Sequence, residues 1–378
     1  MITSPPLPIA PIPDATQFTK ATGPLKTSPR SLQFWRGGTF NIQVAYETWG
    51  ELNEDATNVT LILPGLSPDA HAASSESNPT RGWWEDMVGA RKSICTEENF
   101  VICINHLGSC FGSTGPASKT PDGIAIGMAF PKLSIEDLAM AATYVLDELK
   151  IDTVRTIIGP SMGGLVSLAF MLRFPNRFER CLIISSAARA EAHSIAIHSL
   201  QREAICNDPK WRNGNYLLHE PPIDGMRLAR KIGMSSYRSS IEWEERFGNR
   251  RASETTDHPF AFEFTVESYL RAVAARFADS FDANAYLYLS RAMDWFDVGH
   301  HGASATDALR RLSGKSVGVI SVTTDQLFPP RQQELLANAL TAAGVETSYT
   351  VVDSLKGHDA FLVDIERMGA AITQYLTA

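Results

Sequence analysis

The chain has 378 residues, of which 44% are hydrophobic and 20% charged, as is typical of a globular protein. Its 34 Lys and Arg residues and 42 Asp and Glu residues give a formal net charge of −8. This balance argues against a nucleic-acid partner, because phosphate binding requires clustered basic residues. No apolar run reaches the roughly 20 residues that a membrane-spanning helix needs, so no membrane partner is expected either.

The five cysteines are scattered and include no C-x-x-C pair; they are Cys95, Cys103, Cys110, Cys181 and Cys206. Such an arrangement predicts reduced thiols in a cytoplasmic protein and no metal site. Residues 1–30 are rich in proline and lack the basic and apolar regions of a secretion signal. We expect this segment to be a flexible arm.

Short apolar runs alternate with helical patterns in the first half of the chain. The predicted helices are Ser134–Leu149, with Ser134 and Asp137 as an N-terminal capping signal, and Met162–Arg173. The predicted strands are Phe40–Trp49, Asn58–Pro64, Phe100–Asn105, Val154–Gly159 and Cys181–Ser185. This alternation is typical of an α/β protein with a mostly parallel sheet flanked by helices.

The alternation stops near residue 187, and helical patterns then dominate as far as residue 301. Strand patterns return at Ser316–Val322 and Glu346–Val352. A helical insertion within one α/β sheet explains this order. We therefore predict a core of residues 31–186 and 302–378, with residues 187–301 forming a helical lid.

The segment Gly159–Gly164 fits the G-x-S-x-G pattern between a predicted strand and a predicted helix. In this pattern the serine lies at a sharp turn, so Ser161 is the candidate nucleophile. The Met162 N–H at the start of the helix could stabilise an oxyanion. Leu66, in the loop after the Asn58–Pro64 strand, is the candidate for the second oxyanion donor.

Two residues further along the chain complete a candidate catalytic triad. Asp325 follows the strand at 316–322, and His358 follows the strand at 346–352. Together with Ser161 they occur in the order serine, acid, histidine that this motif requires. His358 would take the proton of Ser161, while Asp325 would orient the imidazole ring and stabilise its charged form.

The chain resembles the homoserine and serine O-acyltransferases of the α/β-hydrolase superfamily. The resemblance covers nearly everything after the N-terminal arm, and it is carried by GLSPDAHAA (65–73), GWWEDMVG (82–89), INHLGSCFGSTGPAS (104–118), GPSMGG (159–164), SIAIHSLQREAI (194–205), GMRLARKIG (225–233), SSYRS (235–239), YLYLSRAMDWFD (286–297), TDQLFP (324–329) and GHDAFLVD (357–364). It implies the α/β-hydrolase fold and acyl transfer from acyl-CoA, through an acyl-serine, to an amino-acid hydroxyl. No permanently bound cofactor is implied.

The resemblance also implies roles for residues outside the triad. Arg230 would bind the α-carboxylate of the acceptor, Asp359 its α-ammonium, and Tyr237 would belong to the same site. A zwitterion held at both charges presents its hydroxyl to the acyl-enzyme in place of water. The family further implies a homodimer formed through the lid helices.

The acyl donor and acceptor are predicted from finer features. The GLSPDAHAA segment resembles the serine-specific branch, so L-serine is the expected acceptor. In the succinyl-transferring serine enzymes that the chain resembles, the position of Phe111 looks like an arginine, which could pair with the free carboxylate of the succinyl group. Phe111 cannot form that pair. The prediction is therefore L-serine O-acetyltransfer from acetyl-CoA. The alternatives are serine O-succinyltransfer, homoserine O-acetyltransfer, a plain esterase that uses water, and a binding protein without catalysis.

Overall fold

The computed structural model describes residues 25–216, 219–252, 258 and 260–378. Its strands are β1 (Leu25–Lys26), β2 (Arg30–Gln33), β3 (Thr39–Ile42), β4 (Ala45–Trp49), β5 (Val59–Ile62), β6 (Val88–Gly89), β7 (Ile94–Cys95), β8 (Phe100–Ile104), β9 (Val154–Pro160), β10 (Phe178–Ile184), β11 (Ser316–Val322) and β12 (Glu346–Val352). Its α-helices are α1 (Ile135–Glu148), α2 (Met162–Arg173), α3 (Ala192–Cys206), α4 (Ile223–Tyr237), α5 (Ser240–Arg246), α6 (Thr265–Ser280), α7 (Ala283–Trp295), α8 (Ala305–Leu309), α9 (Pro330–Ala342), α10 (Ala360–Val363) and α11 (Ile365–Thr377).

The strands form one main sheet in the order β1-β4-β8-β5-β9-β10-β11-β12. β4 runs antiparallel to β1 and β8, and the strands from β8 to β12 are all parallel. The prediction of a mostly parallel sheet is therefore confirmed. Because parallel strands end at the same edge of a sheet, the loops after β5, β9, β11 and β12 all meet there.

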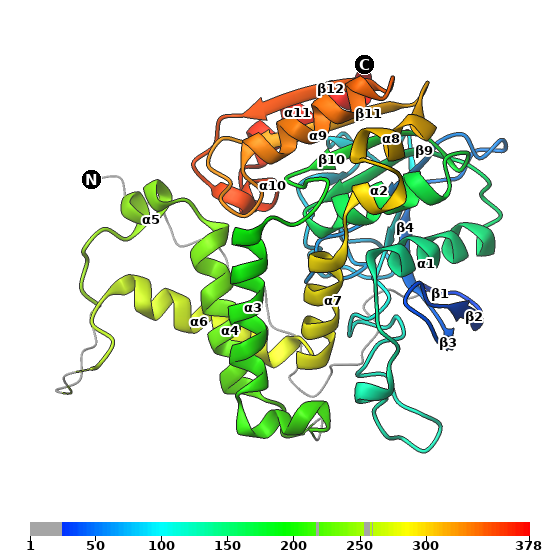
Figure 1. The fold of residues 1–378 in the computed structure, drawn as a ribbon. Helices are drawn as coiled ribbons and strands as arrows, with labels where there is room; N and C mark the ends of the chain where they lie inside the picture. Colours follow the sequence, from blue (N-terminus) through cyan, green and yellow to red (C-terminus); the bar gives the residue numbers. More distant parts are fainter. Residues whose placement is uncertain (1–24, 217–218, 253–257, 259) are drawn as a thin grey trace.

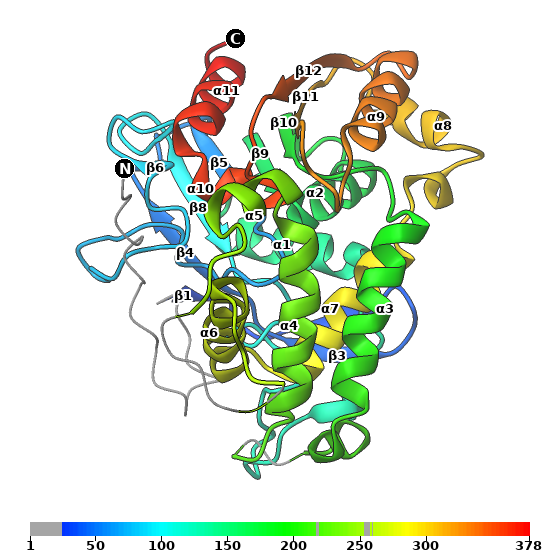
Figure 2. The same cartoon turned by 90° about the vertical axis from the view of Figure 1, so that its left-hand side faces the viewer.

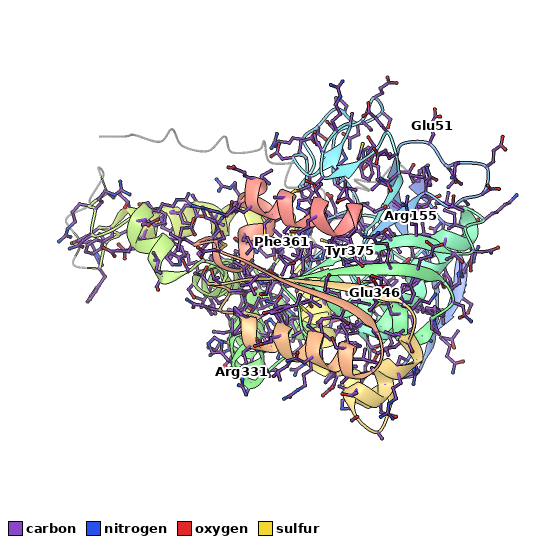
Figure 3. All side chains as sticks on the ribbon, turned by 90° about the horizontal axis from the view of Figure 1, so that it is seen from above. Glu51, Arg155, Arg331, Glu346, Phe361 and Tyr375 are labelled. Carbon is purple, nitrogen blue, oxygen red and sulfur yellow. The ribbon has the colours of Figure 1, made fainter. Side chains whose placement is uncertain are left out.

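Both faces of the sheet are buried. Leu61 and Ile157 belong to one hydrophobic core, whereas their neighbours Ile62 and Ile158 belong to the other. Figure 3 views the sheet along its edge, with α11 and Tyr375 on one side and α9 on the other. Successive side chains of a strand point to opposite faces, so continuous apolar runs such as β5 suit a sheet covered on both sides.

Between β10 and β11 the chain leaves the sheet and forms the helices α3 to α7. Figures 1 and 2 show α3, α4, α6 and α7 extending away from the sheet as one group of helices. Buried side-chain contacts join α3 to α7: Asp294 lies 2.7 Å from His198 Nδ1 and forms a salt bridge of 2.6 Å with Arg202 Nη2. These contacts hold α3 and α7 together.

The N-terminal part of the fold differs from the prediction in two places. The expected strand Phe40–Trp49 is two strands, because β3 pairs with β2 in a separate small sheet while β4 enters the main sheet. The chain bends between them, where the Val44 N–H donates to the Thr27 hydroxyl. The expected flexible arm also ends before residue 30, since Leu25–Lys26 pairs with β4. Residues 1–24 of that arm lie outside the described residues.

Two further features bear on the class of protein. All five cysteines are unpaired thiols. Within the part of the chain that the structure describes, no helix combines the length and apolarity needed to cross a membrane.

Candidate active site

Ser161 lies at the sharp turn between β9 and α2. Its backbone has φ +55° and ψ −123°, a conformation that costs free energy for a residue with a side chain. The turn is held on both sides, because the Ser161 N–H donates to the Ile184 carbonyl and the α2 backbone packs directly on the loop after β5. A Cβ at Gly163 would overlap the Leu63 carbonyl oxygen, which explains why glycine follows the serine at this spacing.

The structure brings Ser161, His358 and Asp325 into one hydrogen-bonded chain. His358 Nε2 lies 2.8 Å from Ser161 Oγ, and His358 Nδ1 lies 2.9 Å from Asp325 Oδ2. The other carboxylate oxygen of Asp325 accepts the backbone N–H groups of Leu327 and Phe328, each at 2.9 Å. All three side chains are buried, so the geometry is that of a nucleophile, a base and an orienting acid shielded from water.

The electrostatic surroundings of His358 favour its charged form. Burial by itself lowers the pKa of the imidazole, but the adjacent Asp325 carboxylate opposes this, and Asp359 adds to the same effect. The net result is a pKa above the ordinary 6.5. A base with a raised pKa accepts the Ser161 proton more readily once it is deprotonated.

The loop that carries Leu66 lies beside the nucleophile. A Cβ added at Gly65 would be 3.8 Å from Ser161 Cβ, and Met162 begins α2 directly after the serine. Leu66 and Met162 therefore each directly follow a residue of the nucleophile's immediate surroundings, Gly65 and Ser161, and their role as oxyanion donors stays a prediction. His106, which the sequence did not single out, holds this loop: its buried Nε2 donates to the Pro64 carbonyl at 2.7 Å. Burial lowers the pKa of His106 to about 4, so it is neutral at physiological pH.

Arg230 of α4 lies at one side of the site. Its guanidinium carbon is 4.5 Å from the centre of the Phe277 ring and 5.5 Å from that of Tyr237. The Tyr237 ring lies 6.1 Å from the His358 ring. Arg230 Nε is buried and has no hydrogen-bond partner among the described residues. A cation placed by aromatic rings and left without an anionic partner is suited to binding a carboxylate from outside the chain.

Asp359 lies in the 3₁₀ helix Gly357–Asp359, next to His358. Its Oδ2 is 3.0 Å from Arg238 Nε, and Arg238 Nη1 is 3.0 Å from Glu242 Oε1. Asp359 is therefore not the acid that orients His358. It belongs to a mostly buried ion-pair network between the lid and the loop of the catalytic histidine. The sequence analysis assigned Arg238 no role, although Arg238 follows Tyr237 in the SSYRS segment that carries the resemblance.

Phe111 lies at the junction of core and lid, where its ring meets that of Phe281 edge to face at 5.6 Å between centres. It also lines a cavity together with Ser67, which directly follows Leu66. The structure thus places the predicted acyl-specificity residue in an apolar contact, on a cavity that starts beside the oxyanion loop.

Residues 63–365 match the family model described as the alpha/beta hydrolase fold. A serine O-succinyltransferase of Litchfieldella anticariensis is 48% identical over 97% of this chain and 99% of its own length. One of Stenotrophomonas maltophilia is 46% identical over 96% of this chain and all of its own length.

The chain belongs to the serine and homoserine O-acyltransferase family of the α/β-hydrolase fold. Both the predicted family and the predicted enzyme class are thereby confirmed, and the protein is an acyltransferase. The acetyl donor predicted from Phe111 is not confirmed, because these relatives are named serine O-succinyltransferases, which matches the stated alternative.

Solved structures similar to this acyltransferase include both transferases and esterases. The homoserine O-acetyltransferase from Bacillus anthracis is 25% identical, with a TM-score of 0.85 over 94% of this chain and 98% of its own. Esterase E22 is 26% identical, with a TM-score of 0.84 over 93% of this chain and 99% of its own. The fold therefore serves both reactions, and the residues around the nucleophile must distinguish them.

Proposed function

We propose that this acyltransferase moves a succinyl group from succinyl-CoA to the side-chain hydroxyl of L-serine. The observation that supports a transferase is a pair of opposite charges at the site, with Arg230 near Tyr237 and Asp359 next to His358. Among the described residues, none forms a salt bridge with Arg230 and none hydrogen-bonds to its buried Nε, whereas Asp359 is a carboxylate adjacent to the catalytic histidine. Such a pair suits the carboxylate and ammonium of a free amino acid, which a simple esterase has no need to bind.

The names of the relatives support serine as the acceptor and succinyl as the acyl group. Identities of 46–48% over nearly the whole chain favour the same substrates. They outweigh the argument from Phe111, which considered one position only. The alternatives are acetyl-CoA as the donor and L-homoserine as the acceptor. Kinetic comparison of the donors and acceptors separates them.

The mechanism follows from the hydrogen-bonded chain. His358 takes the Ser161 proton, and the serine oxygen attacks the thioester carbonyl while the Leu66 and Met162 N–H groups stabilise the oxyanion. The carbon–sulfur bond breaks, and CoA leaves as the thiol with the proton from His358. The hydroxyl of the acceptor then gives its proton to His358 and attacks the acyl-Ser161 ester. Collapse of the second oxyanion releases O-acylserine and returns the proton to Ser161.

A matrix of two donors and two acceptors tests this proposal. CoA release and the acylated product are measured for acetyl-CoA and succinyl-CoA, each with L-serine, L-homoserine or no acceptor. The expected result is the highest kcat/KM with succinyl-CoA and L-serine. CoA release that L-serine does not accelerate would support the esterase alternative. Ser161→Ala is the control: it should retain the fold and lose the acyl-enzyme adduct seen by intact-protein mass spectrometry.

We also propose a homodimer formed through the lid. Large apolar side chains are exposed on this part of the chain, among them Leu200, Leu228 and Phe260. Exposed apolar side chains of this size are suited to contact with a second copy. Sedimentation velocity of the purified chain tests this, and a concentration-independent monomer would contradict it.

The unpaired cysteines support a cytoplasmic location, where thiols remain reduced. Acyl-CoA is proposed as a co-substrate rather than a bound cofactor. Equilibrium dialysis of the purified protein against buffer should leave no CoA attached.

A further inference from the structure

A cavity of about 460 Å³ lies between the oxyanion loop and the segment that follows the catalytic histidine. On one side it is lined by Ser67 and Pro68, which directly follow Leu66. On another it is lined by Leu362, which follows Phe361, and the Phe361 ring lies 5.8 Å from the His358 ring. The cavity is therefore bounded by residues close in sequence to two parts of the catalytic machinery.

Phe111 lines this cavity but brings no charge to it. Its ring packs against Phe281, so an acyl chain beside Phe111 meets an apolar surface, while the acids Asp69, Glu85 and Asp86 also line the cavity. A succinyl group ends in a carboxylate, and a carboxylate in such a place requires a cation or several hydrogen-bond donors. If the donor is succinyl-CoA, another residue must supply them.

Arg81 lines the same cavity. Among the described residues of the lining, it is the one arginine or lysine side chain. The only histidine among them, His71, lies 2.8 Å from Glu47 at its Nδ1 and 2.8 Å from the Thr80 carbonyl at its Nε2. The imidazole is thus already engaged within the protein, whereas the guanidinium of Arg81 extends toward solvent.

The backbone next to Arg81 is held firmly in place. A Cβ at Gly82 would overlap the Ala72 backbone, and the Trp84 N–H donates to the Ala72 carbonyl at 2.8 Å. The segment therefore packs against the continuation of the oxyanion loop, which fixes the point from which the Arg81 side chain starts.

The side chain itself forms an ion pair with Asp86. The Arg81 and Asp86 side chains are 58% and 44% exposed, respectively. Solvent screens such a pair, and it contributes little to stability. The guanidinium can therefore exchange the Asp86 carboxylate for another at small cost, and its two parallel N–H donors match a carboxylate well.

We propose that Arg81 binds the distal carboxylate of the dicarboxylic acyl group and so determines the choice of donor. This inference rests on the proposed succinyl transfer. It assigns to Arg81 the positive charge that Phe111 cannot provide, with the apolar Phe111 side of the cavity accommodating the methylene carbons.

The test compares Arg81→Ala with the unchanged enzyme, using succinyl-CoA and acetyl-CoA at saturating L-serine. The expected result is a loss of about tenfold in kcat/KM for succinyl-CoA, the usual effect of one charge-assisted contact, and a change within about twofold for acetyl-CoA. Equal losses with both donors would assign Arg81 to the CoA phosphates and overturn the proposal. Unchanged values with both donors would overturn it as well.

Two control variants sharpen the comparison. Asp86→Asn removes the competing carboxylate and should leave the preference for succinyl-CoA equal or higher. A fall matching that of Arg81→Ala would mean that the ion pair only shapes the loop, against the proposal. Arg310→Ala removes another exposed arginine paired with an aspartate, and it should leave both donors unaffected.

The outcome also separates this inference from the proposed function. If the unchanged enzyme itself does not favour succinyl-CoA, the proposed function fails and the inference fails with it. If the unchanged enzyme favours succinyl-CoA and Arg81→Ala retains that preference, only the inference fails.

Discussion

Arg238 Nε lies 3.0 Å from Asp359 Oδ2, which joins a lid residue to the residue next to the catalytic histidine. The Arg238 and Asp359 side chains are only 11% and 15% exposed, and Glu242 completes the network from α5. Burial by itself lowers the pKa of Arg238, but the Asp359 and Glu242 carboxylates more than offset this and raise it. The helical insertion thus contributes to the site, because its Arg238 contacts a carboxylate proposed to bind the acceptor.

The variant Arg238→Met tests this positioning role. Asp359 would lose the cation that orients it, so KM for L-serine should rise at least about tenfold. The burst of CoA released on mixing with succinyl-CoA alone should persist, because acyl-enzyme formation does not use Asp359. A parallel loss of the burst and of serine binding would instead indicate a purely structural role. Arg238→Lys keeps the charge but not the planar geometry and should recover part of the serine affinity.

Replacing Arg230 by methionine tests the acceptor site from its other end. Losing a charged contact to the α-carboxylate should raise KM for L-serine by roughly 10- to 100-fold. Slow hydrolysis of the acyl-enzyme in the absence of serine should continue. Arg227→Met is the matched control, since Arg227 lies on the same helix and pairs with Asp224 at its exposed side. Similar kinetics for the two variants would argue against the assignment of Arg230.

The pH dependence of kcat/KM should report the protonation of His358. Only neutral imidazole can accept the Ser161 proton, and the pKa of His358 lies above the ordinary 6.5. Activity should therefore fall as the pH drops through a midpoint above 6.5. The Asp325→Asn variant lacks the carboxylate that raises the pKa of His358. The midpoint of the pH profile should therefore move to lower pH, while kcat falls by about 10⁴-fold. An unmoved midpoint would show that another group controls the acid limb.

The stability of the fold should depend on pH through His106. Its pKa is lowered to about 4 in the folded protein, so below pH 6.5 the unfolded chain binds a proton that the folded chain does not. Stability from this group is complete above pH 6.5 and is lost as the pH falls toward 4. The destabilisation caused by His106→Gln should consequently shrink by about 2 kcal/mol between pH 7.5 and pH 5. Urea unfolding at the two pH values measures it, and a constant difference would contradict the prediction.

Local sequence determined a large part of this protein. The bounds of α2, β11 and β12 agree with the sequence prediction, and Ser134 and Asp137, predicted as an N-terminal capping signal, form a capping box. These features depend on side chains a few residues apart, whose spacing the sequence displays directly. The turn at Ser161 is local in the same sense, because the strand, the glycines and the helix that create it are contiguous.

Only the tertiary structure decided which residues meet across the fold. Nothing in the sequence shows that Arg238 reaches Asp359, that His106 holds the Pro64 carbonyl, or that Arg81 and Phe111 share a cavity. The continuous alternation of Phe40–Trp49 likewise hid the change from one sheet to another. Each of these contacts joins distant segments, and it depends on strand order and on how the lid packs, which periodicity within a single segment does not encode.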